Sequence, residues 1–256
     1  MKVSIFYNPE KEVSLPVVEC IKKFGKENGW EVKEEDPSCE LAIAVGGDGT
    51  LLRTARAVFG RNIPVMGINA GSLGFLTEVP ADEVEDALER IKNGDYTVEN
   101  RMLLEAEFSG KKEYALNDHV VSMTSDMRMI TVRIRIDGTK ITEVSCDGIV
   151  VSTPTGSTAY SLACGGPIVT PGINATILTP ISPHTLSFRP LVVDPEDTIE
   201  IIPLTPATLV VDGQHRYELE KDKPVRIKKA PFSLPLIRTG KRGYFEILRS
   251  KLGWGK

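Results

Sequence analysis

Residues 41–59, LAIAVGGDGTLLRTARAVF, decide the fold, because a short apolar run stops at a glycine-rich turn and a helical pattern begins directly after it. The apolar run from Leu41 to Val45 has the length and composition of a buried strand. The apolar residues between Leu51 and Phe59 recur at helical spacing, and Gly60 follows them as a C-terminal stop. The stretch therefore predicts a strand, a glycine loop and a helix, in this order.

The glycine loop has the properties of a phosphate-binding site. Gly47 and Gly49 let the backbone approach a ligand closely, and the N-terminus of the following helix offers N–H groups to an anion. Asp48 contradicts a plain phosphate site, because a carboxylate repels an anion unless a metal ion or a transferable proton intervenes. Asp48 would either help to hold Mg²⁺ against a polyphosphate or accept the proton of an attacking hydroxyl. Both roles belong to phosphoryl transfer, and Arg53, one turn into the helix, would add positive charge near the phosphates.

A simpler interpretation of the same loop stays open. Asp48 would then only cap the helix, and the glycines would only make the turn tight. The loop is also different from the G-x-x-x-x-G-K phosphate loop, since no lysine lies in it. The loop taken alone therefore leaves a catalytic and a structural role for Asp48.

Length and composition bound the class of protein. A chain of 256 residues, 41% hydrophobic and 26% charged, is long enough for two globular domains. No apolar run approaches the length of a membrane span, and the N-terminus does not resemble a signal peptide, so we expect a cytoplasmic protein without a membrane partner. A net charge of -4 argues against a nucleic-acid surface. Four scattered cysteines and three histidines make a zinc site improbable.

The N-terminal part alternates strands with helices, which favours a Rossmann-like, doubly wound parallel sheet. The expected strands are 2–7, 30–33, 41–45 and 63–68, and the expected helices are 15–28, 51–59 and 82–92. In such a sheet the ligand lies beyond the C-terminal ends of the strands. We therefore expect the GGDGT loop and the second loop, 69–76, to share one rim, with Asn69 and Phe75 in the second loop.

From Tyr96 onward the apolar period changes from helical to two, which predicts a second, β-sandwich-like domain. The expected strands are 102–108, 113–123, 128–136, 148–152, 175–181, 198–204, 207–211, 215–219 and 224–228. A terminal helix at about 243–253 is expected to pack back on the first domain. The predicted domains are thus 1–98 with this helix, and 99–242.

One segment of the second domain, residues 147–167, departs from alternation and is dense in hydroxyls. Thr155, Thr158 and Ser161 offer donors and acceptors, and Tyr160 offers an aromatic face. These side chains suit a nucleoside, although hydroxyls in loops more often cap helices and form turns.

Two short polar sequences of the second domain are also candidates. Asn117 and Asp118 interrupt a strand and suit a ribose diol, although such a pair is more often a bulge or a strand end. The sequence Asp212-Gly213-Gln214 is equally compatible with an ordinary hairpin turn and with a binding role.

The motifs GGDGT, GINAGSLGFL, LND and DGIVVSTPTGSTAYSLACGGP resemble, in order and spacing, those of the NAD kinases. The resemblance covers nearly the whole chain. The first motif is shared with diacylglycerol and sphingoid-base kinases, and in looser form with 6-phosphofructokinases. The TPTGSTAY…GGP segment is far more specific, so we identify the chain as similar to the NAD kinases.

The resemblance implies transfer of the terminal phosphoryl group of ATP, or of polyphosphate, to the 2′-hydroxyl of the adenosine ribose of NAD, giving NADP. It implies a divalent metal, Mg²⁺, held through the nucleotide phosphates with no direct protein ligand, and a homodimer or homotetramer. Asp48 resembles the proton acceptor, Phe75 the residue flanking the adenine, and Asp147 the acid facing the nicotinamide. Asp118 stands where relatives have Glu. The candidate nucleotide-binding residues are Gly47, Gly49, Arg53, Asn69, Phe75, Asn117, Asp118, Asp147, Thr155, Thr158, Ala159, Tyr160, Ser161, Ala163, Asp212 and Gln214.

Two other functions compete with this one. A lipid kinase would share only the GGDGT loop and would need a membrane-facing surface, yet the sequence has no basic amphipathic helix. A dinucleotide-binding sensor would use Asp48 only as a cap, and would bind NAD without transferring phosphate.

Overall fold

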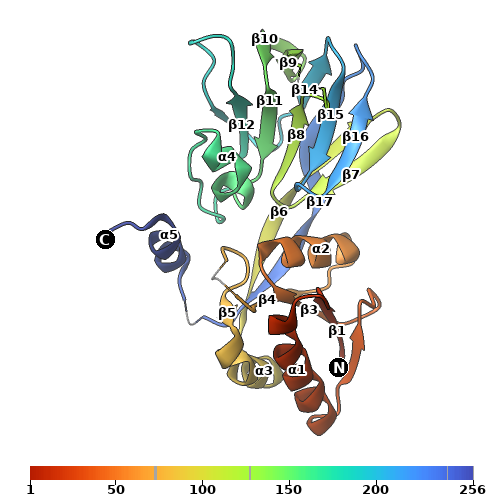
Figure 1. Cartoon of the computed structure of the whole chain (residues 1–256), viewed down its shortest axis with the longest axis vertical. Coiled ribbons are helices and arrows are strands. Elements are labelled where there is room, and N and C mark those ends of the chain that lie inside the picture. The colour runs from red at the N-terminus through yellow and green to blue at the C-terminus, as the bar shows by residue number, and fades with distance from the viewer. Residues whose placement is uncertain (72–73, 127, 241, 256) are drawn as a thin grey trace. The chain divides into compact units, whose positions relative to one another are not determined.

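The computed structural model describes residues 1–71, 74–126, 128–240 and 242–255, and the chain forms two compact units (Figure 1). The first unit is Met1–Asn100 together with Ser233–Lys256, and the second is Arg101–Phe232. The segment 233–242, expected in the second domain, belongs to the first unit, because the end of a long strand joins the parallel sheet there.

The first unit contains a parallel sheet in the order β2-β1-β3-β4, and β5 pairs in parallel with β4. Its strands are β1 (Lys2–Tyr7), β2 (Glu31–Glu34), β3 (Leu41–Gly46), β4 (Val65–Asn69) and β5 (Val79–Pro80). Every residue of β3 is buried, as expected for a strand covered on both faces.

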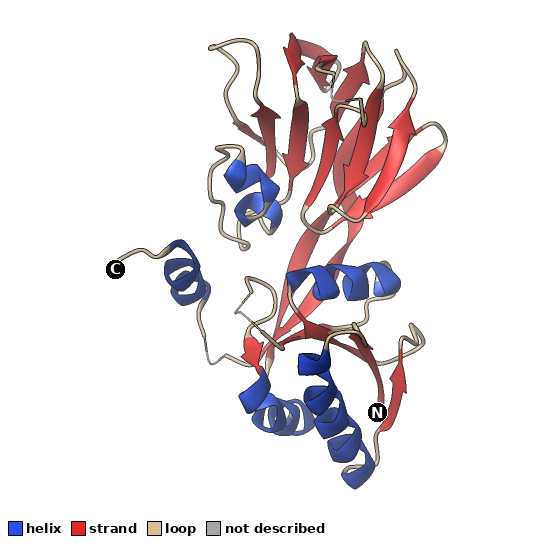
Figure 2. Ribbon diagram, viewed as in Figure 1, coloured by secondary structure: helices blue, strands red, loops and turns tan. Residues whose placement is uncertain are grey.

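Helices cover both faces of this sheet, so the doubly wound arrangement is confirmed (Figure 2). Helices α1 and α3 share one core cluster with the strands, and α2 lies on the opposite face. The helices of this unit are α1 (Leu15–Glu27), α2 (Asp48–Val58), α3 (Val84–Asn93) and α5 (Tyr244–Leu252), with 3-10 turns at Glu12–Ser14 and Ala81–Glu83. None of the helices in the described part of the chain is long and apolar enough to cross a membrane.

The second unit contains antiparallel strands in two layers. One layer is a six-stranded sheet in the order β13-β12-β11-β8-β15-β16. Its strands are β8 (Asp118–Ser122), β11 (Gly148–Ser152), β12 (Thr176–Ile181), β13 (Leu191–Val193), β15 (Ala207–Val211) and β16 (His215–Leu219). The 3-10 turn Gly156–Thr158 and the short helix α4 (Tyr160–Ala163) follow β11.

The other layer orders its strands β10-β9-β14-β17, and β6 pairs with both β17 and β7. Its strands are β6 (Thr97–Phe108), β7 (Lys111–Ala115), β9 (Ile130–Ile136), β10 (Thr139–Cys146), β14 (Ile199–Pro203) and β17 (Val225–Arg238). Strands β6 and β17 continue by their ends into the first unit.

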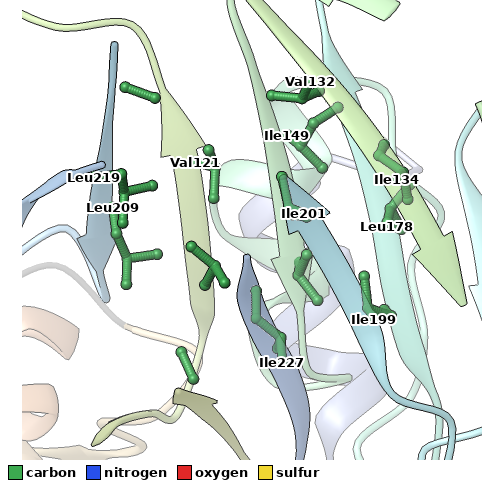
Figure 3. Packing of buried hydrophobic residues seen from close by; sticks show 14 of the residues in the cluster. Val121, Val132, Ile134, Ile149, Leu178, Ile199, Ile201, Leu209, Leu219 and Ile227 are labelled. Atoms are coloured by element: carbon green, nitrogen blue, oxygen red, sulfur yellow. The ribbon is translucent and has the colours of Figure 1, made fainter. Parts of the chain in front are cut away.

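Apolar side chains from both layers meet in one core, which confirms the sandwich (Figure 3). Val132 and Ile134 of β9 lie in the same cluster as Ile149 of β11 and Leu209 of β15. All residues of this cluster lie between Met102 and Ile227, so the second unit has a hydrophobic core of its own.

Several strand predictions were wrong in their limits. The strand expected at 113–123 is two strands, because the chain passes from one layer to the other between β7 and β8. The strand expected at 224–228 is the first part of the much longer β17. Strand β10 was not predicted at all, although it forms a hairpin with β9 through a turn at Asp137-Gly138, where both residues have positive φ.

Candidate functional site

The glycine loop connects β3 to α2 in the first unit, as expected. Gly46 has a φ of 153°, and a Cβ there would lie 2.4 Å from the Thr50 hydroxyl, so the turn itself requires glycine. Around the Cβ positions of Gly47 and Gly49, by contrast, no atom of the described chain lies within 4 Å apart from their chain neighbours and the nearby backbone of α2. The space beside these two exposed glycines is therefore open to a ligand, next to the N-terminus of α2.

Asp48 is the first residue of α2, and its carboxylate binds a neighbouring loop. Oδ1 accepts hydrogen bonds from the amide of Leu76 at 3.0 Å and from the amide and hydroxyl of Thr77, each at 3.2 Å. Oδ2 accepts one from the amide of Phe75 at 2.9 Å. The cap position of the helix is taken by Gly47, so Asp48 joins two loops, a role different from simple capping.

The second loop is held close to Asp48 by several tight contacts. A Cβ at Gly74 would lie 2.0 Å from Oδ1 of Asp48, so only glycine fits there. Asn69, at the end of β4, donates from Nδ2 to the Thr77 hydroxyl at 3.2 Å and accepts from the amide of Gly71 at 2.6 Å. Ser72 and Leu73 of the same motif lie outside the described residues. The rim expected from the two motifs therefore forms within the first unit.

Arg53 is partly exposed one turn along α2, and its guanidinium contacts this unit. It donates to Glu35 at 2.7 Å and to the carbonyl oxygen of Tyr7 at 2.7 Å. A phosphate would have to compete with Glu35 for this group, so the predicted phosphate role of Arg53 requires exchange of a surface ion pair.

The residue after the Asp48-binding loop, Glu78, takes part in a buried ion pair. Its carboxylate lies 2.8 Å from the Arg238 guanidinium, and both side chains are at most 7% exposed. Glu78 also accepts from the amide of Thr239 at 2.9 Å, and Arg238 donates to Glu99 at 3.2 Å. The end of β17 is thereby tied to the loop that holds Asp48.

In the second unit, the turn between β15 and β16 organises the Asn117-Asp118 motif. Asp212 has a φ of 48°, and its carboxylate accepts from the amides of Leu116 at 2.9 Å, Asn117 at 2.7 Å and Asp118 at 3.1 Å. The hairpin and the binding interpretation of Asp212 are therefore compatible, since this turn residue positions two other candidates.

Asp118 is 4% exposed, and its pKa is raised from an ordinary 3.8 to about 7. Burial is the larger cause, because it penalises the charged carboxylate, and the nearby charge of Asp212 adds to it. At neutral pH the carboxyl group is thus divided between a form that donates a hydrogen bond and a form that only accepts.

A pocket of about 380 Å³ lies beside these residues. Among the candidates predicted from the sequence it brings together Asn117, Asp118, Ala159, Tyr160 and Asp212. Its other lining residues are Val120, Ser122, Val210, Gly213 and Arg216. The lining joins an apolar floor to an exposed aromatic ring and a few polar groups, which is the usual composition of a small-molecule site.

The hydroxyl-rich segment is ordered mainly by its own side chains. The Thr153 hydroxyl donates to the carbonyl of Leu116 at 2.6 Å, and the Thr155 hydroxyl accepts from Arg101 at 3.3 Å. The Ser161 and Thr179 hydroxyls lie 2.9 Å apart, and Thr158 donates to the carbonyl of Thr155 at 3.3 Å. The turn-forming role of these hydroxyls is therefore present, and Thr155, Thr158 and Ser161 do not line the pocket.

The remaining candidates of this unit lie outside the pocket lining. Asp147 precedes β11, and its charge contributes, after burial, to the raised pKa of Tyr160. Ala163 is exposed at the end of α4, and Gln214 is exposed beside the Asp212 turn. These three residues are not part of the pocket lining.

Thr77 and Arg216 are among the site residues that were missed from the sequence. Thr77 donates twice to Asp48, and Arg216 lines the pocket. The signal for Thr77 was only its position directly after the second rim loop. Arg216 belongs to an alternating strand in which a charged residue normally indicates a solvated face.

Family models match both parts of the chain. Residues 7–96 match the model of the ATP-NAD kinase N-terminal domain, and residues 116–239 match that of the ATP-NAD kinase C-terminal domain. NAD kinases of Pseudomonas putida (strain GB-1) and Pseudomonas entomophila (strain L48) are each 43% identical over 226 residues, which is 85% of this chain and 76% of each relative.

Two solved structures share the fold. Yeast NADH kinase complexed with NADH has a TM-score of 0.92 at 22% identity, over 100% of this chain and 88% of that one. An NAD kinase from Archaeoglobus fulgidus in complex with ATP has a TM-score of 0.83 at 29% identity, over 99% of this chain and 98% of that one. With both domain models matched over most of its length, this chain belongs to the ATP-NAD kinase family.

Proposed function

We propose that this NAD kinase transfers the terminal phosphoryl group of ATP to the 2′-hydroxyl of the adenosine ribose of NAD, with Asp48 as the general base. Phosphorylation of NAD follows from membership of the family. The choice of donor, the acceptor hydroxyl and the role of Asp48 are the parts that we propose.

The observation that carries the role of Asp48 is the unequal use of its two carboxylate oxygens. Oδ1 accepts three hydrogen bonds, whereas Oδ2 accepts one. A carboxylate oxygen has two lone pairs, so Oδ2 keeps acceptor capacity for the proton of a hydroxyl. The fixed loop contacts hold the carboxylate in one orientation, and a positioned base of this kind contributes roughly 10² to 10⁴ in rate.

The ATP proposal is supported by the open space beside Gly47 and Gly49 at the N-terminus of α2. Backbone amides and the helix dipole there favour an anionic group. The structure of the archaeal NAD kinase is a complex with ATP, and ATP is the donor that we propose for this chain. Positioning and charge neutralisation supply most of the acceleration in phosphoryl transfer.

We also propose that a divalent metal, Mg²⁺, arrives with the nucleotide. Within the described ranges, no group of three or more His, Cys, Asp or Glu side chains is arranged to hold a metal ion. The ion would neutralise phosphate charge when bound through the phosphates. Purified protein supplied with ATP and NAD is expected to lose activity in EDTA and to recover it when Mg²⁺ is restored.

A matrix of donors and acceptors tests the proposed reaction. Wild-type protein with Mg²⁺ is incubated with ATP or inorganic polyphosphate against NAD, NADH or a diacylglycerol, and the phosphate position is read by ³¹P NMR. We expect a 2′-phosphate on NAD with ATP. Phosphate on a lipid, or NAD binding without transfer at any ATP concentration, would contradict the proposal in favour of a lipid kinase or a sensor. Light scattering in the same samples tests the expected dimer or tetramer.

A further inference from the structure

The pocket of the second unit occupies half of one face of its six-stranded sheet. The other half is covered by the segment that follows β11, since the Ser161 hydroxyl contacts the Thr179 hydroxyl of β12 at 2.9 Å. Val120, Val210 and Arg216 are register partners on adjacent strands, so they lie side by side on the uncovered half. Arg216 is thus part of the pocket floor.

The Arg216 guanidinium is available to a ligand. Its side chain is exposed and makes no ion pair or hydrogen bond with any residue in the described part of the chain. The carboxylate of Asp212 already accepts three backbone hydrogen bonds. Asp118 is buried and is only partly ionised at neutral pH. In the described part of the chain, neither acid of the pocket forms an ion pair with the guanidinium.

The lining indicates the chemistry of the ligand. Val120 and Val210 offer an apolar floor, and Tyr160, which is 47% exposed, offers a ring for a planar group. Asp118 in its protonated form donates a hydrogen bond and does not repel an anion. A guanidinium fork matches phosphate oxygens in bidentate geometry. The combination suits a planar nucleoside that carries phosphate.

We propose that Arg216 binds the diphosphate of the dinucleotide in this pocket and is the residue that makes binding depend on the charge of that diphosphate. The inference rests on the proposed function, because it takes NAD as the ligand. It adds a cationic residue that the sequence motifs do not contain, on the strand after the Asp212 turn.

The test compares NAD with adenosine, which has no phosphate, by calorimetry on wild-type, Arg216→Gln and Arg216→Lys proteins. We expect Arg216→Gln to weaken NAD binding by roughly tenfold or more, the scale of a lost charge-assisted hydrogen bond, and to leave adenosine binding unchanged. Arg216→Lys keeps the charge and loses the fork, so its NAD affinity should be intermediate. Raising the salt concentration should weaken NAD binding more in the wild type than in Arg216→Gln.

Arg226→Gln is the matched control, because Arg226 is an exposed arginine of the same unit that pairs with Glu200 at 2.9 Å and lies outside the pocket. Its NAD affinity should equal that of the wild type. Equal NAD affinity in Arg216→Gln, or an equal loss for NAD and adenosine, would overturn the role of Arg216 alone. A wild-type protein that neither binds NAD nor forms NADP would overturn this role together with the proposed function.

Discussion

Asp48 combines two tasks that the sequence presented as alternatives. Its carboxylate organises the rim by accepting backbone hydrogen bonds from residues 75–77, and Oδ2 keeps capacity for a proton. The same contacts that hold the rim together would keep a base oriented. The motif predicted that Asp48 matters, but the partners of its carboxylate come from a loop about 28 residues away, which no local pattern reveals.

The ionisation of Asp118 makes stability depend on pH. Its folded-state pKa of about 7 lies above the ordinary 3.8, so the folded protein binds this proton more tightly than the unfolded chain. Protonated Asp118 contributes up to about 4 kcal/mol to the free energy of unfolding. This contribution is fully present below about pH 4 and is lost as the pH rises toward 7. Asp118→Asn should therefore melt higher than the wild type at pH 8, with the difference shrinking toward pH 5.

Scanning calorimetry between pH 5 and 8 measures this difference. The charged or titratable groups around Asp118 are Asp212 in the hairpin turn, Arg216 on β16, and Tyr160 and Cys164 near α4. Burial raises the pKa of both Tyr160 and Cys164, so neither titrates in this window. Asp82→Asn, at an exposed acid, is the control and should show no such trend. A pH-independent difference for Asp118→Asn would contradict the account.

Gly156 marks a close approach of the hydroxyl-rich segment to the Asn117 backbone. A Cβ there would lie 2.1 Å from the carbonyl oxygen of Asn117, whereas at Gly172 it would meet no atom of the described chain within 4 Å. Gly156→Ala should destabilise the protein by about 2 kcal/mol or more, because the segment must shift, and Gly172→Ala should stay within about 0.5 kcal/mol. Urea unfolding followed by circular dichroism measures both, and equal stability of the two variants would contradict the contact.

At the scale of elements, the β3–loop–α2 unit was predictable because the apolar period changes abruptly at the glycines. Strand β17 was not, because Pro231 and Pro235 interrupt its sequence and proline normally ends a strand. The separation of β7 from β8 was also missed, although the interruption at Asn117 and Asp118 was recognised as a possible strand end. Only the pairing of each strand shows that they belong to different layers.

The buried pair of Glu78 and Arg238 gives an element-scale prediction. Arg238→Met removes the guanidinium that pairs with the buried Glu78 carboxylate, which should destabilise the first unit by about 3 to 5 kcal/mol. Adding Glu78→Gln removes the carboxylate charge as well while an oxygen remains for the Thr239 amide, so the double variant should be more stable than Arg238→Met. Both tryptophans, Trp30 and Trp254, lie in this unit, so their fluorescence in urea reports on it.

A double variant no more stable than Arg238→Met would contradict this account of the pair. The surface pair of Lys92 and Glu89 provides the comparison, since Lys92→Met should cost less than about 1 kcal/mol.

At the scale of the whole molecule, the sequence predicted a parallel α/β unit and a β-sandwich, and both are present. The first unit divides from the second at Asn100, two residues from the limit predicted by the change of period, and again at Ser233, inside the continuous strand β17. For the sites, motif residues such as Asn117 and Tyr160 were recognisable, while Arg216 required the sheet register to show that it shares a face with Val210.

The self-contained core of the second unit predicts that it folds alone. Its buried cluster lies entirely between residues 102 and 227, so a fragment of residues 101–232 should show a cooperative thermal transition and dispersed amide resonances. A fragment without amide dispersion would show that the ends of β6 and β17 in the first unit are needed for folding.

The measurement that tests the central claim most directly is single-turnover phosphorylation of NAD by Asp48→Asn, with NAD affinity determined on the same sample. Thr77→Val is the matched control, because it removes one donor to Asp48 and leaves the carboxylate in place. The account predicts that Asp48→Asn transfers phosphate roughly 10² or more times slower while NAD affinity is largely kept, and that Thr77→Val stays close to the wild type. Transfer by Asp48→Asn within tenfold of the wild type, or an equal loss in Thr77→Val, would contradict Asp48 as the base.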